Sequence, residues 1–109
     1  MEKGHLAEIN ACAIDEIDEE DVLRFDHNGR TYVIIRMMGD DIYCMDGQCS
    51  HEQVHLCDGL VMDHVIECPK HNGRFDVRTG KALAAPVYEH LKTYPVKVRE
   101  GRVFVTLEN

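Results

Sequence analysis

The chain has 109 residues, which is the size of one ordinary domain. Apolar residues make up 44% of it, so one small core can form, and 12 Lys and Arg against 20 Asp and Glu give a formal net charge of −8. That charge argues against nucleic acid and an anionic membrane as partners, because both attract basic surfaces, and it suits encounters with a basic patch on another protein.

The N-terminal segment 1–20 is acidic and mixed, without the basic and apolar regions of a secretion signal. No apolar run approaches the ~20 residues of a membrane helix. We therefore expect a cytoplasmic protein. Its five cysteines are an odd number, which in such a chain favours metal binding over disulfides. Cys12 and Cys44 have apolar neighbours in the sequence and are predicted to be core residues.

Most of the chain has the alternating pattern of β-strands. The predicted strands are 23–26, 31–37, 42–45, 61–68, 91–98 and 102–107. Turn signals lie at Asn28-Gly29, Gly39-Asp40-Asp41, Arg78-Thr79-Gly80-Lys81 and Glu100-Gly101. The Asn-Gly pair is a strong hairpin signal, and the last two strands are predicted to form a hairpin. Only segment 15–23 could hold a helical turn. Many short strands imply an all-β sandwich or barrel.

Two long irregular segments, 47–59 and 68–76, interrupt the strands, and irregular loops on a β scaffold often carry function. The first contains Cys49-Ser50-His51, and the second contains Cys68-Pro69-Lys70-His71. Sixteen residues separate His51 from Cys68, enough for an outgoing strand and a return, so the two loops can meet. A Rieske-type [2Fe–2S] cluster needs two thiolates and two imidazoles. Cys49 and Cys68 can bind its inner iron, and His51 and His71 its outer iron.

In order and spacing, C-x-H followed after sixteen residues by C-x-x-H resembles the Rieske motif. The run CPKHNGRFD at 68–76 looks like the second cluster loop of the small soluble Rieske ferredoxins, and Ala85-Pro86 stands where that family has a proline-bearing loop. The resemblance covers 14–107. It implies a Rieske fold, an antiparallel β sandwich or barrel in one domain, 1–109, with a two-loop cluster-binding subdomain at approximately 44–86. One [2Fe–2S] cluster would be bound by Cys49, His51, Cys68 and His71.

The same resemblance implies an electron carrier rather than an enzyme. Such a carrier passes single electrons from a flavin-dependent reductase to a terminal Rieske oxygenase, and a monomer suits that role. No G-x-G-x-x-G, P-loop or mononuclear-iron facial triad is apparent. Segments 67–76 and 91–98 look like ferredoxins of rhizopine-catabolism and aromatic-dioxygenase systems. On the family pattern, the docking surface would surround the two histidines and include Glu52, Val54, Leu56, Asp58 and Pro86.

Departures from high-potential relatives predict the reduction potential. Those relatives have a disulfide where this chain has Val54 and Lys70, and they have hydroxyl donors to cluster sulfur where it has Gly73 and Phe75. Hydrogen bonds to sulfur favour the reduced cluster, so their absence predicts a potential toward the low end of the Rieske range of about −150 to +300 mV.

Three alternatives remain at this point. A structural zinc site also uses Cys and His, although zinc modules more often have C-x₂₋₄-C pairs. The small Rieske-like subunit of assimilatory nitrite reductase would share the fold, but some of its members lack the ligands. A hydrolytic Cys/His site explains two Cys/His pairs poorly. His55 and Cys57, also in the first loop, are predicted to line it rather than to bind metal, and His64 is predicted to be an exposed strand residue.

Overall fold

Short strands and single turns of 3₁₀ helix make up the regular structure, for which the computed structural model describes residues 5–50, 54–70, 72–85 and 89–108. The elements are β1 (Leu6–Ala13), η1 (Ile14–Glu16), β2 (Asp21–His27), β3 (Arg30–Arg36), β4 (Ile42–Asp46), η2 (Leu56–Asp58), β5 (Leu60–Met62), β6 (Val65–Glu67), β7 (Arg74–Asp76), β8 (Ala82–Ala84), β9 (Thr93–Tyr94), β10 (Val96–Arg99) and β11 (Arg102–Glu108). No helix within these ranges is long and apolar enough to cross a membrane. The predicted all-β class is confirmed.

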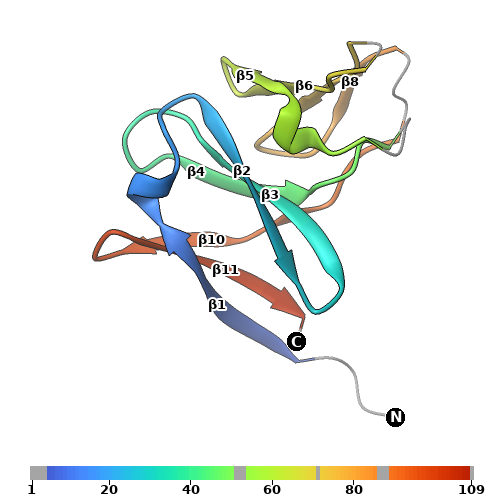
Figure 1. Ribbon diagram of the computed structural model, residues 1–109. Helices are drawn as coiled ribbons and strands as arrows, with labels where there is room; N and C mark the ends of the chain where they lie inside the picture. Colours follow the sequence, from blue (N-terminus) through green and yellow to red (C-terminus); the bar gives the residue numbers. More distant parts are fainter. Residues whose placement is uncertain (1–4, 51–53, 71, 86–88, 109) are drawn as a thin grey trace.

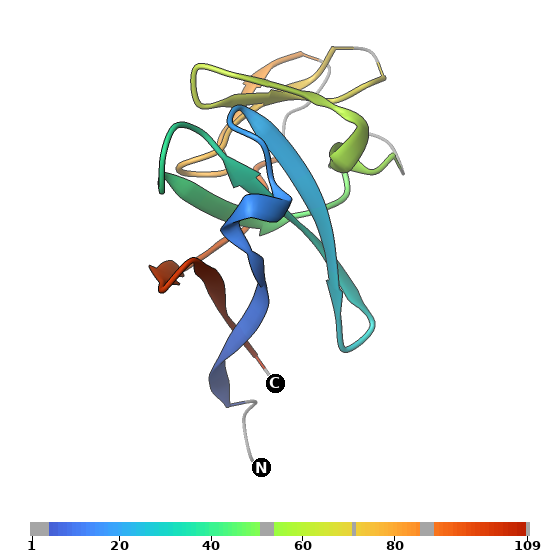
Figure 2. The ribbon, with the colours of Figure 1, turned by 60° about the vertical axis from the view of Figure 1, so that its left-hand side comes forward.

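Three antiparallel sheets form layers, as Figures 1 and 2 show. The sheet with strand order β2-β3-β4-β9 lies between the sheet β1-β11-β10 and the sheet β5-β6-β7-β8. We call these the middle sheet, the lower sheet and the upper sheet, in that order. A lower core fills the space between the lower and middle sheets, and an upper core fills the space between the middle and upper sheets. The lower core contains Cys12, Ile14, Ile17, Tyr32, Ile34, Ile42, Cys44, Val103, Val105 and Leu107. The upper core contains Val33, Ile35, Met37, Met45, Cys49, Leu56, Val61, Ile66, Cys68, Phe75, Val77 and Leu91.

Strand β3 belongs to both cores, which explains why its sequence is apolar without alternation. Ile34 faces the lower core, and its neighbours Val33 and Ile35 face the upper core, all three with no exposed surface. Successive side chains of a strand point to opposite faces, so a middle-layer strand needs apolar residues at every position. Each such side chain contributes about 1.5–3 kcal/mol on burial. Cys12 and Cys44 are core residues, as predicted.

The hairpin at Asn28-Gly29 is confirmed: His27 pairs with Arg30, and the two turn residues have φ of 51° and 77°. A two-residue loop with positive φ at both positions matches the right-handed twist of the strands. The turns at 39–41, 78–81 and 100–101 are also present. They connect β3 to β4, β7 to β8, and β10 to β11.

The prediction of a single strand over 61–68 is wrong. The segment forms the hairpin β5–β6, in which Asp63 and His64 have φ of 53° and 64° and Met62 pairs with Val65. Without glycine or proline, this turn has no clear sequence signal. His64 is therefore a turn residue rather than a strand residue. It is half-buried, and its Nε2 lies 2.9 Å from Asp41 Oδ2 in the β3–β4 turn.

Pro95 divides the strand predicted at 91–98. Before it, Tyr94 pairs with Cys44 in the middle sheet, and after it, Val96 pairs with Val105 in the lower sheet. Proline has no backbone N–H for a strand ladder, so the chain changes sheets at this residue. The Pro95 carbonyl accepts a hydrogen bond of 2.9 Å from Thr106 N–H.

Further elements also differ from the prediction. The acidic N-terminal segment holds β1, which pairs with β11 along its length. The helical turn expected within 15–23 is η1, at Ile14–Glu16, and β2 already begins at Asp21. The irregular segments contain η2 and β7, which were not predicted. In each case pairing or packing with distant residues overrides weak local patterning.

Candidate metal centre

Cys49 and Cys68 come from different loops and are buried in the same upper core. Cys49 follows β4 and is 6% exposed, while Cys68 follows β6 and is 1% exposed. Neither cysteine forms a disulfide. The structure therefore brings together the two predicted sulfur ligands. His51 and His71, the predicted nitrogen ligands, lie outside the described residues. Within the described residues, no group of three or more potential metal ligands occurs.

The loops that carry the cysteines close in the same way. Cys49 N–H donates to the Val54 carbonyl over 3.0 Å, and Cys68 N–H donates to the Gly73 carbonyl over 2.6 Å. In each loop the cysteine thus bonds to a residue five positions later. His51 and His71 belong, by sequence, to the segments that these bonds close.

Gly47 lies at the base of the first loop. Its carbonyl accepts a hydrogen bond of 2.7 Å from Leu56 N–H, and Gln48 forms an antiparallel bridge with His55. A Cβ at position 47 would lie 2.7 Å from His55 Nε2, closer than side-chain atoms normally approach. The base of the loop is therefore a narrow hairpin that requires glycine.

A third segment is tied to both loops. Ser50, which stands between Cys49 and His51 in the sequence, donates its hydroxyl to the Glu89 carbonyl over 2.8 Å. One residue later, His90 Nδ1 accepts a hydrogen bond of 3.0 Å from Ala82 N–H in β8. The segment around Glu89 is thereby fixed between the first loop and the upper sheet. Pro86, expected beside the metal centre, lies outside the described residues.

The environment of the two thiols fits an iron–sulfur group. Thiolates are the soft ligands that such a group needs, and apolar side chains such as Leu56 and Phe75 share their core. An apolar shell limits the access of solvent and influences the potential. Phe75 has no exposed surface, and its side chain has no hydroxyl that could donate a hydrogen bond to cluster sulfur.

His55 and Cys57 line the first loop, as predicted. His55 Nε2 lies 2.7 Å from Thr31 Oγ1, and His55 Nδ1 accepts a hydrogen bond of 3.1 Å from Cys57 N–H. Both ring nitrogens therefore have protein partners. Cys57 is half-buried, and burial raises the pKa of its thiol above the ordinary value.

One predicted docking residue is misplaced. Leu56 was expected on the surface around the two histidines, but it is 0% exposed, because the turn η2 directs it into the upper core. Val54 is half-buried and Asp58 is exposed. Glu52 lies outside the described residues.

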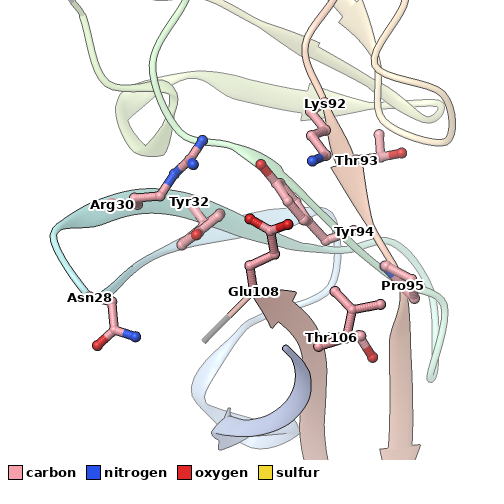
Figure 3. Close-up of a pocket in the computed structure, with 10 residues that line it drawn as sticks. Asn28, Arg30, Tyr32, Lys92, Thr93, Tyr94, Pro95, Thr106 and Glu108 are labelled. Atoms are coloured by element: carbon pink, nitrogen blue, oxygen red, sulfur yellow. The ribbon is translucent and has the colours of Figure 1, made fainter. Parts of the chain in front are cut away.

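Figure 3 shows a cleft of about 360 Å³ in a different part of the molecule. It lies beside the β2–β3 turn and the end of β11, and is lined by residues that include Arg30, Tyr94 and Glu108. Tyr94 donates its hydroxyl to Asp46 Oδ1 over 2.6 Å. None of the lining residues is one of the four predicted ligands.

Comparisons with known proteins identify the family and agree with the fold. The family described as Rieske [2Fe–2S] domain matches residues 7–95. The ferredoxin component of the naphthalene 1,2-dioxygenase system of Pseudomonas aeruginosa is 44% identical over 99 residues, covering 91% of this chain and 94% of that one.

Two solved structures are similar to this one. A chain in the complex of reduced oxygenase and oxidised ferredoxin in carbazole 1,9a-dioxygenase has a TM-score of 0.83 at 31% identity, covering 90% of this chain and 91% of that one. A putative NADH-dependent nitrite reductase small subunit from Mycobacterium tuberculosis has a TM-score of 0.82 at 18% identity, covering 99% of both chains. The latter likeness shows the fold alone.

Proposed function

Since this chain belongs to the Rieske [2Fe–2S] domain family, we propose that Cys49, His51, Cys68 and His71 bind its [2Fe–2S] cluster and that it carries single electrons between two proteins. The main support is that Cys49 and Cys68 lie buried in one core, each in a loop closed by its own N–H. The zinc alternative loses support, because the matching family is defined by an iron–sulfur cluster.

The protein's own contribution is to hold the ligands and exclude water. When bound, the cluster accepts and releases one electron. The upper core keeps both thiols away from solvent, and the hydrogen bonds to Val54 and Gly73 hold the backbone of both cysteines. A rigid setting limits reorganisation when the charge changes.

We propose a flavin-dependent reductase as the electron donor and a terminal Rieske oxygenase as the acceptor. Two facts support these partners: the Pseudomonas relative is a ferredoxin component of a dioxygenase system, and a similar chain occurs in a complex of oxygenase and ferredoxin. The formal charge of −8 suits short-lived contacts with basic surfaces. The nitrite reductase alternative has weaker support, because that likeness is 18% identical.

The proposal includes the organisation of the chain. It acts as one domain, 1–109, in which the cluster-binding subdomain spans approximately 44–86, as a cytoplasmic monomer. The upper sheet β5-β6-β7-β8 supports this subdomain, because it runs from Leu60 to Ala84 and contributes much of the core around Cys68.

Electron paramagnetic resonance of the dithionite-reduced protein tests the ligand set. We expect the low mean g value of mixed Cys/His ligation, and we expect His51→Ala and His71→Ala to abolish or transform the signal. Cys49→Ser should act in the same way, whereas Cys57→Ser, in the same loop, should keep the wild-type signal. A colourless protein with one zinc per chain, or an unchanged spectrum in the His51 or His71 variant, would refute the assignment.

Neighbouring genes test the choice of partners. Genes for an oxygenase large subunit and a reductase beside this one would support the proposal. A sirohaem reductase gene in that place would favour the nitrite reductase alternative.

A further inference from the structure

His55 connects the first ligand loop to the middle sheet. The residue is half-buried and lies four positions after His51 in the sequence. Its Nε2 is 2.7 Å from Thr31 Oγ1 in β3, and its Nδ1 accepts the Cys57 N–H bond of 3.1 Å. One imidazole thus joins the turn η2 to strand β3, where its partner Thr31 is 24 residues away in the chain.

The hydrogen bonds around Thr31 determine the tautomer of this ring. Thr31 donates its only hydroxyl proton to Asp26 Oδ1 over 2.6 Å. The Thr31 oxygen must therefore accept a hydrogen bond from His55, which places the imidazole proton on Nε2. Nδ1 then has a free lone pair, as its bond from Cys57 N–H requires. We call this chain of two hydrogen bonds a relay: His55 Nε2–H donates to Thr31 Oγ1, and the Thr31 hydroxyl donates to Asp26 Oδ1.

The ring lies at the base of the hairpin that carries Cys49. His55 forms the antiparallel bridge with Gln48, and His55 Nε2 closely covers Gly47. The preceding residue, Val54, accepts the Cys49 N–H bond. A displacement of His55 would therefore move both sides of the hairpin and, with them, the backbone of Cys49.

We propose that His55 is a positioning residue for the metal centre, which ties the first ligand loop to β3 through Thr31 and Asp26 and so fixes where Cys49 stands relative to Cys68. This inference rests on the proposed function. The second histidine of the loop thus holds the loop in place through hydrogen bonds of both ring nitrogens, to Thr31 and to Cys57.

A matched pair of substitutions at Thr31 tests the relay without changing His55. Thr31→Val has nearly the same shape but no hydroxyl, whereas Thr31→Ser keeps the hydroxyl. In the Thr31→Val variant of the reduced holoprotein we expect a broadened or shifted electron paramagnetic resonance spectrum and a faster loss of iron to a chelator than in the wild type. Thr31→Ser should resemble the wild type. His55→Ala should give the same defect as Thr31→Val or a larger one.

His64→Asn is the control for a general loss of stability. His64 is also half-buried and bonds a residue of a distant turn, Asp41, but it lies outside the first loop. We expect it to keep the wild-type spectrum and rate of iron loss. Wild-type spectra and rates in both Thr31→Val and His55→Ala would overturn the role of His55 and leave the proposed function intact. A wild-type protein without a Rieske signal would overturn the proposed function itself.

Discussion

Replacing Gly80 with alanine should destabilise the upper core next to the segment that bonds the first ligand loop. Gly80 follows the turn after β7 and has φ of +76°, and a Cβ there would overlap the Leu91 carbonyl oxygen. Gly80 also accepts a hydrogen bond of 2.8 Å from Leu91 N–H. Leu91 belongs to the upper core and lies two residues after Glu89, which bonds Ser50. The substitution therefore pushes this segment away from the first loop.

Gly29→Ala separates the backbone cost from the steric cost. Gly29 has nearly the same φ, +77°, but no heavy atom lies within 4 Å of a Cβ built there. Alanine in this region costs about 1–2 kcal/mol, partly offset by roughly 0.4–1 kcal/mol from the stiffer unfolded chain, so we expect a loss of about 1 kcal/mol. Gly80→Ala adds two further losses. Breaking the hydrogen bond from Leu91 N–H costs about 1 kcal/mol, and exposing the buried Leu91 side chain costs about 1.5–3 kcal/mol.

The thermal unfolding midpoints of both holoprotein variants measure the difference. For a domain of this size, 1 kcal/mol lowers the midpoint by roughly 4–8 °C. We expect a shift of that size for Gly29→Ala and one about 3.5 to 5 times as large for Gly80→Ala, since its loss is about 3.5–5 kcal/mol. Hydrogen exchange at the Leu91 amide should accelerate in Gly80→Ala alone. Equal shifts in the two variants would refute the steric argument.

Three further changes test other parts of the structure. Tyr94→Phe removes the hydrogen bond of 2.6 Å to Asp46, and should cost about 1.5–3 kcal/mol; an unchanged thermal midpoint would contradict this. Phe75→Tyr places a hydroxyl where high-potential relatives have one, and should raise the potential measured by redox titration; a lower potential would speak against it. Burial holds the pKa of His55 below its ordinary value of 6.5. Stability from the neutral ring is therefore complete above pH 6.5 and is lost as pH falls through the folded pKa. The midpoint should fall more steeply below pH 6.5 in wild type than in His55→Asn, and equal slopes would exclude this contribution.

Local sequence patterns were sufficient to predict the elements whose residues strongly favour one conformation. Asn28-Gly29 predicts its own hairpin, because both residues tolerate positive φ. The hairpin turn at Asp63-His64 has the same conformation without glycine, so nothing local distinguishes it from a strand. Strand β1 exists because β11 pairs with it, a contact that its sequence does not reveal.

For the candidate site as well, the sequence predicts one part and the packing of the sheets decides another. The order and spacing of Cys49, His51, Cys68 and His71 predict the donor set from the sequence alone, because coordination requires those atoms whatever the fold. That Cys49 and Cys68 share one core, and that Leu56 turns inward, depends on the packing of the upper sheet on the middle one.

The sequence by itself determined the all-β class and the family, and it predicts the ligand types, since these depend on residue identity and short spacings. Only the tertiary structure decided the role of His55. Its partner Thr31 is 24 residues away, Asp26, to which Thr31 donates, is 29 residues away, and a hydrogen bond acts over about 3 Å. No local pattern encodes such a contact, because it arises only when the middle sheet and the first loop have packed together.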